Sequence, residues 1–411
     1  MFKRETFLSL LTLVVVAALI AVGLPISANS GFLSTATPPP SPTNNGGNAQ
    51  WTILSSSFES NFPKGFTFRL EATSTGGKIV SAAALWRHSP VSSRTRRLAQ
   101  IDESGTKMVA VWEKVPGDAV PQWAGVEYWW LLQDESGNIY ETPREYAEYA
   151  DNTRKWSRME SDDIIVFWQE GVPDRIGPLT IAAMERQRPL YEQSWANPLG
   201  YKPRAIIYAD FETWAEWSPG RGTVGGGLVV VGQTSQSWGA TAQVYDPIIQ
   251  PVEEVANDTV LHEVAHLYQY ANGGTSGLRW FIEGNATFFE LTSGPRIEQR
   301  VRRWAREGRL PSLQEQGPGG REAYDVGYMF WVWLTETYGM EAHRRVWELI
   351  RSGRTQRAAL EAISNVSFIE METAFRTWLG AVNPEVPTPL PTLPFFLPPT
   401  PTYEPTPRRG P

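Results

Sequence analysis

The sequence predicts a multidomain protein in which an all-β module precedes an α+β domain. Between Trp51 and about Asp151, apolar residues recur at every second position and turn residues separate the runs, which is typical of short β-strands. From about Trp156 onward, strand-like runs alternate with apolar residues at helical spacing. With 411 residues, 41% hydrophobic and 20% charged, the chain is long enough for more than one core.

The first thirty residues have the features of an export segment. Lys3 and Arg4 precede an apolar run from Phe7 to Leu24, and small residues follow at 28–30. We expect residues 1–30 to be either a cleaved signal peptide or an uncleaved membrane anchor that spans through residues 7–24. Basic residues before the run favour the inner side of the membrane. In both cases the remainder is predicted to be extracellular or at the cell surface.

Two further segments have little apolar content to bury. Residues 31–50 are rich in Pro, Gly and Asn and predict a linker, and residues 384–411 are rich in Pro and predict a disordered tail. The domains therefore fall at 51–151 for the β module and 155–383 for the α+β domain.

Charge and cysteine content exclude several classes of function. The net charge is −7, and no run of Lys or Arg suggests a nucleic-acid groove. We interpret the arginines at 94–97 and 300–306 as solvated faces. The chain has no cysteine, which excludes disulfides, thiolate zinc sites and cysteine catalysis.

The β module has the alternation of a sandwich. Its apolar positions are Phe66, Phe68, Leu70 and Ala72; Met108, Ala110 and Trp112; and Val126, Tyr128 and Trp130, before a turn at 134–137. The pattern resembles immunoglobulin- or fibronectin-like modules appended to exported enzymes, which implies a spacer or docking role without chemistry. Tryptophans such as Trp129, Trp130, Trp331 and Trp333 are expected in cores.

In the α+β domain the expected strands are 163–168, 205–209 and 228–231. The expected helices are 178–191, 259–270, 279–290, 297–307, 324–338, 341–351 and 368–382.

The stretch TVLHEVAHLYQY carries the chemistry. It holds His262, Glu263 and His266 in the order H-E-x-x-H, and residues four apart share one face of a helix, so both imidazoles can reach one metal ion. Asn257 or Asp258 is the expected N-cap, and Gly273 the expected stop. The other two histidines, 88 and 343, lack a partner at metal spacing and are expected to be structural.

A downstream segment, RWFIEGNATFFE, resembles the W-x-x-E-G-x-A helix of gluzincin metallopeptidases, which include thermolysin-like and aminopeptidase-N-like enzymes. The resemblance covers roughly residues 225–340. It implies a catalytic Zn²⁺ held by His262, His266 and Glu283, with Glu263 as general base. The segment AYDVGYMFWVWLTETYG resembles the family's Y-x-x-G helix, which implies Tyr324 as the oxyanion donor.

Two alternatives stay open at the site. Tyr328, one turn after Tyr324, is the other candidate for the oxyanion donor. Glu290 lies on the face of Glu283 and is either a group that orients a ligand histidine or an exposed glutamate.

The stretch GGGLVVVGQ, at 225–233, occupies the place of the family's cleft strand, which pairs with extended substrate. It lacks the glutamate of the aminopeptidase motif G-x-M-E-N. The sequence therefore predicts an exported zinc peptidase acting on peptides or proteins, more an endopeptidase than an aminopeptidase. The alternative is a zinc-binding but non-catalytic surface adhesion or scaffold protein.

Overall fold

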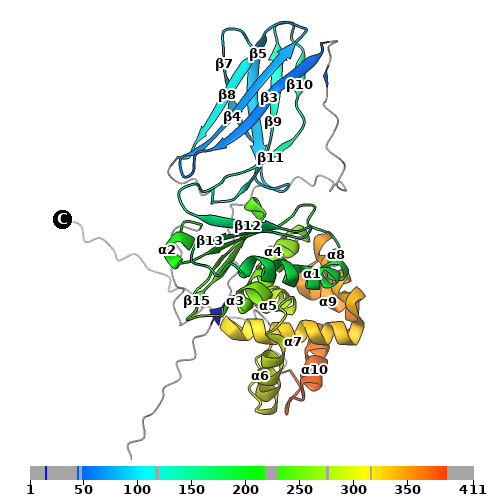
Figure 1. Ribbon diagram of the computed structural model, residues 1–411. Helices are drawn as coiled ribbons and strands as arrows, with labels where there is room; N and C mark the ends of the chain where they lie inside the picture. Colours follow the sequence, from blue (N-terminus) through cyan, green and yellow to red (C-terminus); the bar gives the residue numbers. More distant parts are fainter. Residues whose placement is uncertain are drawn as a thin grey trace, which may run out of the picture.

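The computed structural model describes residues 49–115, 120–217, 229–274, 277–314 and 317–386, together with the two-residue strands β1 (Val14–Val15) and β2 (Asn44–Asn45). Several β-sheets make up the N-terminal region and helices dominate the C-terminal region (Figure 1). The predicted leader, linker and tail lie almost wholly outside the described residues. Within the described residues no helix is long and apolar enough to cross a membrane.

Two antiparallel sheets form the N-terminal region. One has the strand order β3, β4, β8, β7, and the other β2, β10, β9, β5, β6, with β11 also paired to β9. A single core joins the sheets, because the apolar faces of β4 and β8 meet those of β5 and β9. Trp129 and Trp130 are buried, as expected. The strands are β3 Trp51–Ser60, β4 Gly65–Ser74, β5 Ile79–Arg87, β6 Thr95–Leu98, β7 Gln100–Ile101, β8 Lys107–Glu113, β9 Gly125–Asp134, β10 Ile139–Glu141 and β11 Glu145–Glu148.

A mixed five-stranded sheet follows, in the order β12, β13, β14, β17, β16. The central pairs β13–β14 and β14–β17 are parallel, and the outer strands β12 and β16 run antiparallel to their neighbours. The strand predicted at 228–231 corresponds to the short β15. The edge strand of the five-stranded sheet is β16, which begins a few residues later than the predicted strand. The strands are β12 Trp156–Glu160, β13 Ile165–Gln169, β14 Arg204–Tyr208, β15 Val229–Val230, β16 Gly232–Ser235 and β17 Ala240–Val244.

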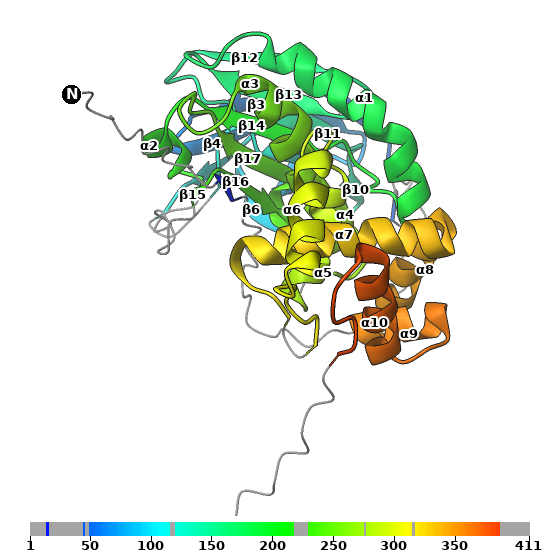
Figure 2. The ribbon, with the colours of Figure 1, turned by 90° about the horizontal axis from the view of Figure 1, so that it is seen from below.

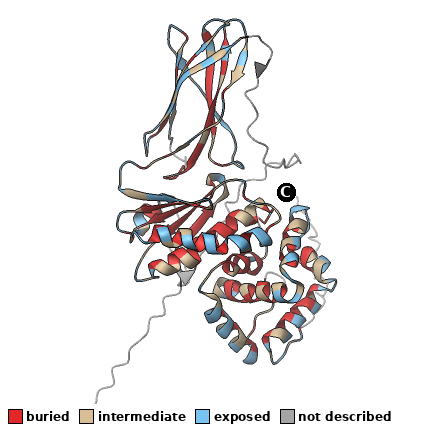
Figure 3. Cartoon of the chain, turned by 45° about the vertical axis from the view of Figure 1, so that its right-hand side comes forward, coloured by how far each residue is buried: buried red, intermediate tan, exposed pale blue. Residues whose placement is uncertain are grey.

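The two faces of this sheet bury different partners. One face packs under the N-terminal region, where Trp123 stacks on Phe167 with ring centroids 4.7 Å apart and Tyr208 Oη donates to Gln122 Oε1 at 3.0 Å. The opposite face contributes Val166 and other residues to the large core shared with the helices. Figure 3 shows buried residues concentrated in these strands and in the central helices.

Ten α-helices and two short helical turns complete the described residues. They are α1 Ile176–Ser194, α2 Phe211–Trp214, η1 Gln236–Trp238, α3 Val252–Glu254, η2 Val255–Thr259, α4 Val260–Ala271, α5 Arg279–Phe288, α6 Gly294–Arg306, α7 Gly320–Tyr338, α8 Met340–Arg351, α9 Gln356–Ser364 and α10 Phe368–Leu379. Helix α9 was not predicted. Trp331 and Trp333 of α7 are buried, in agreement with the sequence interpretation.

The predicted N-cap of the H-E-x-x-H helix is wrong. Asn257 and Asp258 lie inside the π-helical turn η2, so the helical run begins at Val252 and continues into α4. Asp258 instead accepts hydrogen bonds from the backbone N–H and the hydroxyl of Thr292. A side chain used for a tertiary contact is not available to cap its own helix. The stop is near its predicted place, because Gly273 has a φ of +83°.

The interpretation of the second arginine cluster as a solvated face is wrong for one member. Arg300 forms a two-pronged ion pair with the buried Asp325, through Nε at 2.5 Å and Nη2 at 2.9 Å. Paired, fork-like contacts of this kind are the strong form of an arginine–carboxylate interaction. The arginines at 94–97 are exposed, as expected.

Helices α5 and α7 cross in direct backbone contact, with α7 below α5 in Figure 1 and the two helices again next to each other in Figure 2. The contact is made by two glycines. A Cβ on Gly284 would lie 2.2 Å from the carbonyl carbon of Gly327, and a Cβ on Gly327 would lie 1.9 Å from the carbonyl oxygen of Trp280. No side chain fits at either position. These are the glycines of the E-G-x-A and Y-x-x-G segments.

We therefore expect Gly327→Ala to lower the free energy of unfolding by at least about 1–3 kcal/mol, because the added methyl group overpacks a backbone contact. Urea unfolding followed by circular dichroism measures the change. Gly319→Ala is the matched control, since a Cβ there meets nothing within 4 Å. Equal stabilities for the two variants would contradict the close crossing.

Candidate metal centre

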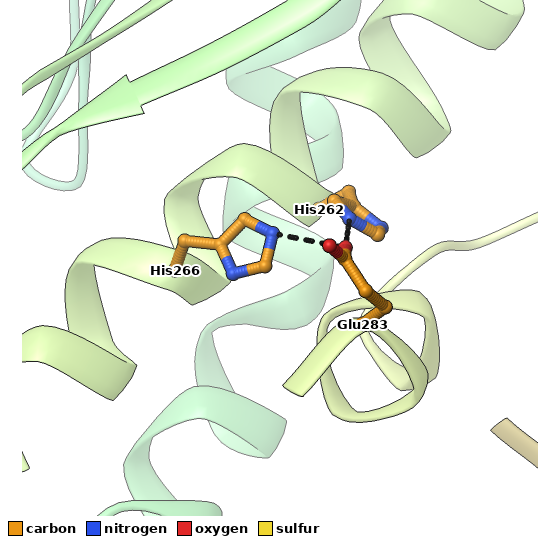
Figure 4. A group of neighbouring side chains, drawn as sticks. All are labelled: His262, His266 and Glu283. Carbon is orange, nitrogen blue, oxygen red and sulfur yellow. Dashed lines mark hydrogen bonds and ion pairs between the residues drawn. The ribbon is translucent and has the colours of Figure 1, made fainter. Parts of the chain in front are cut away.

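Three side chains predicted to act together meet beneath the mixed sheet. His262 and His266 come from α4 and Glu283 from α5, and one ligand atom of each lies within 4.8 Å of the other two (Figure 4). The Nε2 atoms of His262 and His266 lie 3.4 and 3.5 Å from Glu283 Oε2. All three residues are at most 4% exposed. The sequence spacing alone placed the histidines on one face, and the crossing of α4 and α5 adds the carboxylate.

Glu290 fixes the orientation of His262. Its Oε1 lies 2.8 Å from His262 Nδ1, and Ser293 donates a hydrogen bond to its other carboxylate oxygen. The contact makes Nδ1 the donor to Glu290 and leaves Nε2 as the nitrogen that faces Glu283 and the centre. Of the two sequence alternatives for Glu290, the structure favours the group that orients a ligand histidine.

His266 is fixed by an amide. Its Nδ1 lies 2.7 Å from Gln269 Oε1, which is buried on the same helix one turn later. The amide oxygen accepts from Nδ1–H, so Nε2 of His266 is the nitrogen that faces the centre. The two imidazoles thus present equivalent nitrogens to one point.

Charge balance holds the centre together without a metal. Burial opposes ionisation of Glu283, but hydrogen bonds and the charges of both histidines outweigh it and lower the pKa of Glu283 to about 2. Burial likewise opposes protonation of His262, yet contacts with Glu283 and Glu290 raise its pKa to about 10. A proton on His262 takes the place that a cation would fill.

The donor set fits a divalent metal such as zinc. Two neutral imidazole nitrogens and one carboxylate oxygen are the protein ligands of many catalytic zinc sites, which leave a fourth position open. His266 Nε2 and Glu263 Oε1 are buried atoms without a hydrogen-bond partner among the described residues. Unsatisfied buried polar atoms are rare, and their gathering here indicates a site built for a ligand.

Glu263 is separate from the ion-paired group. The hydroxyl of Thr234, on the edge strand β16, donates to Glu263 Oε2, and burial raises the pKa of Glu263 to about 7. Gly232 of the same strand leaves room for the carboxylate of Glu263, because a Cβ at this position would lie 2.6 Å from Glu263 Oε1. A carboxylate with a pKa near neutrality can both accept and return a proton.

The two tyrosines predicted as alternatives face different places. The ring of Tyr324 stacks on that of His262 with centroids 5.7 Å apart, and the guanidinium of Arg279 lies 5.8 Å from the centre of the Tyr324 ring. The hydroxyl of Tyr328 points instead toward Gly294 at the start of α6, 2.5 Å from where a Cβ would be. The placement favours Tyr324 as the tyrosine of this centre.

Several residues at the centre were not found from the sequence. Gln269 follows His266 by three positions, so helical spacing could have revealed it. Arg279, whose Nε lies 4.0 Å from Glu283 Oε1, is one turn before that glutamate and was equally accessible. Thr234 lies on a strand far from α4 in sequence, and no local pattern indicates its contact with Glu263.

Comparisons with known proteins give little. No family model matches the chain, and no curated protein matches it. Among solved structures, native yeast LTA4 hydrolase aligns over 84% of this chain and 69% of its own, with 10% identity and a TM-score of 0.28. The same yeast enzyme in complex with bestatin aligns with equal coverage and identity and a TM-score of 0.30. Scores this low establish neither fold nor function.

Metal uptake should release a proton. At pH 7.5 His262 is protonated in the metal-free protein, since its pKa is raised to about 10, and a metal needs the neutral ring. We expect the affinity for zinc to rise about tenfold per pH unit between pH 6 and 8, one proton being displaced. Calorimetry in buffers of different ionisation enthalpy measures this proton. An affinity independent of pH would contradict the assignment.

Proposed function

We propose that this protein is an exported zinc-dependent peptidase of the gluzincin type. The observation that carries the proposal is the buried group of His262, His266 and Glu283 with a separate carboxylate, Glu263, beside it. Its two acidic residues differ sharply, because the pKa of Glu283 is lowered to about 2 while that of Glu263 is raised to about 7. Such a pair suits one ligand and one proton carrier.

A zinc ion held by the three ligands would polarise the scissile carbonyl and lower the pKa of bound water toward neutrality. Glu263 takes a proton from the attacking water and passes it to the leaving amine. The hydroxyl of Tyr324 donates to the carbonyl oxygen as negative charge develops there, and Arg279 beside it supports that charge. Thr234 keeps the carboxylate of Glu263 pointed into the site.

Internal cleavage agrees best with the edge of the sheet. Strand β16 pairs only with β17 among the described strands, so its other edge is suited to an extended substrate through backbone hydrogen bonds. Residues 229–235 contain no acid to pair with a substrate's free amino group. Glu290, a possible substitute, is already bonded to His262 and Ser293. An unpaired buried ammonium is costly, which disfavours an aminopeptidase.

A cationic cavity adjoins the centre and supports a preference for acidic substrates. It has a volume of about 880 Å³ and includes Arg279, Arg354 and Arg357 but no acid among its described lining residues. Arg279 lines this cavity and its Nε lies 4.0 Å from Glu283 Oε1, so one side chain borders both the cavity and the metal centre. An acidic side chain or a carboxyl terminus a few residues from the cut would meet positive charge there.

The first test replaces the proposed base. Glu263→Gln keeps the shape of the side chain but cannot accept a proton, so we expect cleavage of an unfolded protein to fall by at least about 10²-fold while one zinc per chain remains. Metal analysis and a fluorescent casein assay measure the two quantities. A wild-type protein that binds zinc but cleaves nothing would favour the scaffold alternative, and the absence of zinc would refute both.

The second test separates the tyrosines. Loss of an oxyanion donor costs about 10²–10³ in kcat, so Tyr324→Phe should lose that much with KM little changed. Tyr328→Phe is the matched control, because its hydroxyl faces Gly294, and its kcat should stay near that of the wild type. The reverse order would assign the role to Tyr328.

The third test uses a mixed peptide library and mass spectrometry of the products. We expect internal cuts that are equally efficient on N-acetylated and free peptides, with Asp or Glu enriched near the cut. Arg354→Ala should reduce cleavage of acidic peptides up to about fivefold, since a partly exposed ion pair contributes up to about 1 kcal/mol. Arg303→Ala, on α6, is the control. Stepwise removal of N-terminal residues, blocked by acetylation, would overturn the endopeptidase assignment.

Export and a spacer or docking role for the immunoglobulin- or fibronectin-like region are parts of the same proposal. Both rest on sequence patterns. N-terminal sequencing of the protein from fractionated cells tests export, because a start near Gly31 indicates secretion, retention of residues 7–24 indicates an anchor, and a cytosolic protein refutes it.

A further inference from the structure

A chain of buried side chains leads from His266 away from the centre. Gln269 Nε2 donates to Asn285 Oδ1 at 3.0 Å and to the backbone oxygen of Ile282 at 2.8 Å. Asn285 Nδ2 in turn lies 2.9 Å from His343 Nε2, on α8. Gln269, Asn285 and His343 are at most 1% exposed. Three helices thus contribute to one hydrogen-bonded path that ends at a histidine expected from the sequence to be only structural.

The path has a direction. An amide group donates only through its nitrogen and accepts only through its oxygen. If His343 Nε2 accepts from Asn285, the oxygen of Asn285 must face Gln269, and the oxygen of Gln269 must face His266. His266 then donates from Nδ1 and presents Nε2 to the centre. The backbone oxygen of Ile282, which can only accept, holds the amide of Gln269 in the same sense. The tautomer of His266 is therefore set jointly by Ile282 and by the acceptor at the far end of the path.

His343 is suited to the role of a permanent acceptor. Its ring is enclosed by aromatic side chains, with the centroid of Trp331 at 4.3 Å and that of Phe288 at 5.2 Å. Burial lowers the pKa of His343 to about 3, so it stays neutral at any physiological pH. The neutral ring places its proton on Nδ1, which has no hydrogen-bond partner among the described residues. A protonated His343 could not accept, and the path would lose the acceptor at its far end.

We propose that His343, through Asn285 and Gln269, is a positioning residue that, together with the backbone oxygen of Ile282, holds the tautomer and orientation of the ligand His266. The proposal rests on the proposed function in one respect, that His266 binds zinc. The two ligand histidines then differ in kind: His262 is held by the charged Glu290, and His266 by a neutral path that adds no charge. Because only one of the two ligand histidines is hydrogen-bonded to a carboxylate, less negative charge surrounds the bound cation. More of its positive charge is then available to polarise the substrate.

The test compares His343→Phe, which keeps a ring in the aromatic enclosure but removes the acceptor, with His343→Gln, whose amide oxygen can accept in place of Nε2. Zinc affinity of the metal-free full chain is measured by competition with a chromophoric chelator. Loss of a group that orients a metal ligand typically costs 10- to 100-fold in affinity. We expect about that loss for His343→Phe and affinity within about threefold of the wild type for His343→Gln.

Visible absorption of the cobalt-loaded protein gives a second readout of ligand geometry. It should change in His343→Phe and return in His343→Gln. Phe288→Leu is the matched control, because it alters packing around the same ring without touching the path; its melting temperature should fall while zinc affinity and the cobalt spectrum stay unchanged. Wild-type affinity in His343→Phe, or equal losses in all three variants, would overturn the proposal. A wild-type protein without zinc would instead refute the proposed function.

Discussion

The contact between the backbones of α5 and α7 is the constraint on which the site depends. Gly284 follows Glu283, and Gly327 lies one turn after Tyr324, so the place where the helices touch is also the place where the two functional side chains leave them. Any side chain at either glycine would push the helices apart by its own width and carry the tyrosine away from His262. The glycines of the two sequence segments are thus two halves of one contact.

Electrostatics then divides the buried acids into two kinds. Glu283 forms ion pairs with both ligand histidines, which lower its pKa, whereas Glu263 lies beside the same cluster but accepts a hydrogen bond from a hydroxyl. Burial without a counter-ion favours the protonated form of a carboxyl group. The arrangement therefore keeps Glu283 as a negative charge and leaves Glu263 free to exchange a proton. Burial beneath Gly232 of β16 raises the pKa of Glu263, and the hydrogen bond from Thr234 on the same strand partly offsets that rise.

Local patterns predicted much of this and long-range contacts much less. The H-E-x-x-H spacing placed both histidines on one face, and period-two alternation located the strands β4, β8 and β9, because these are properties of single elements. The sequence interpretation failed where a side chain serves a distant partner: Asp258 bonds to Thr292 in place of capping its helix, and Arg300 pairs with Asp325. His343 is buried, as a structural histidine would be, and its link to His266 has no local sequence signal because it passes through side chains on two other helices.

The stacking of Trp123 on Phe167 bears on how the chain is divided. An accessory domain that is joined to an enzyme by a flexible hinge can change its orientation relative to the catalytic part. Here the N-terminal region shares a layer of aromatic side chains with the mixed sheet, and Tyr208 in that layer is fully buried. Rotation of the N-terminal region against the sheet would expose this layer to water. The N-terminal region is therefore packed against the face of the mixed sheet that lies opposite the helices. A cut near residue 153 would expose the aromatic face of the mixed sheet, and we expect the two parts predicted from the sequence to fold as one body.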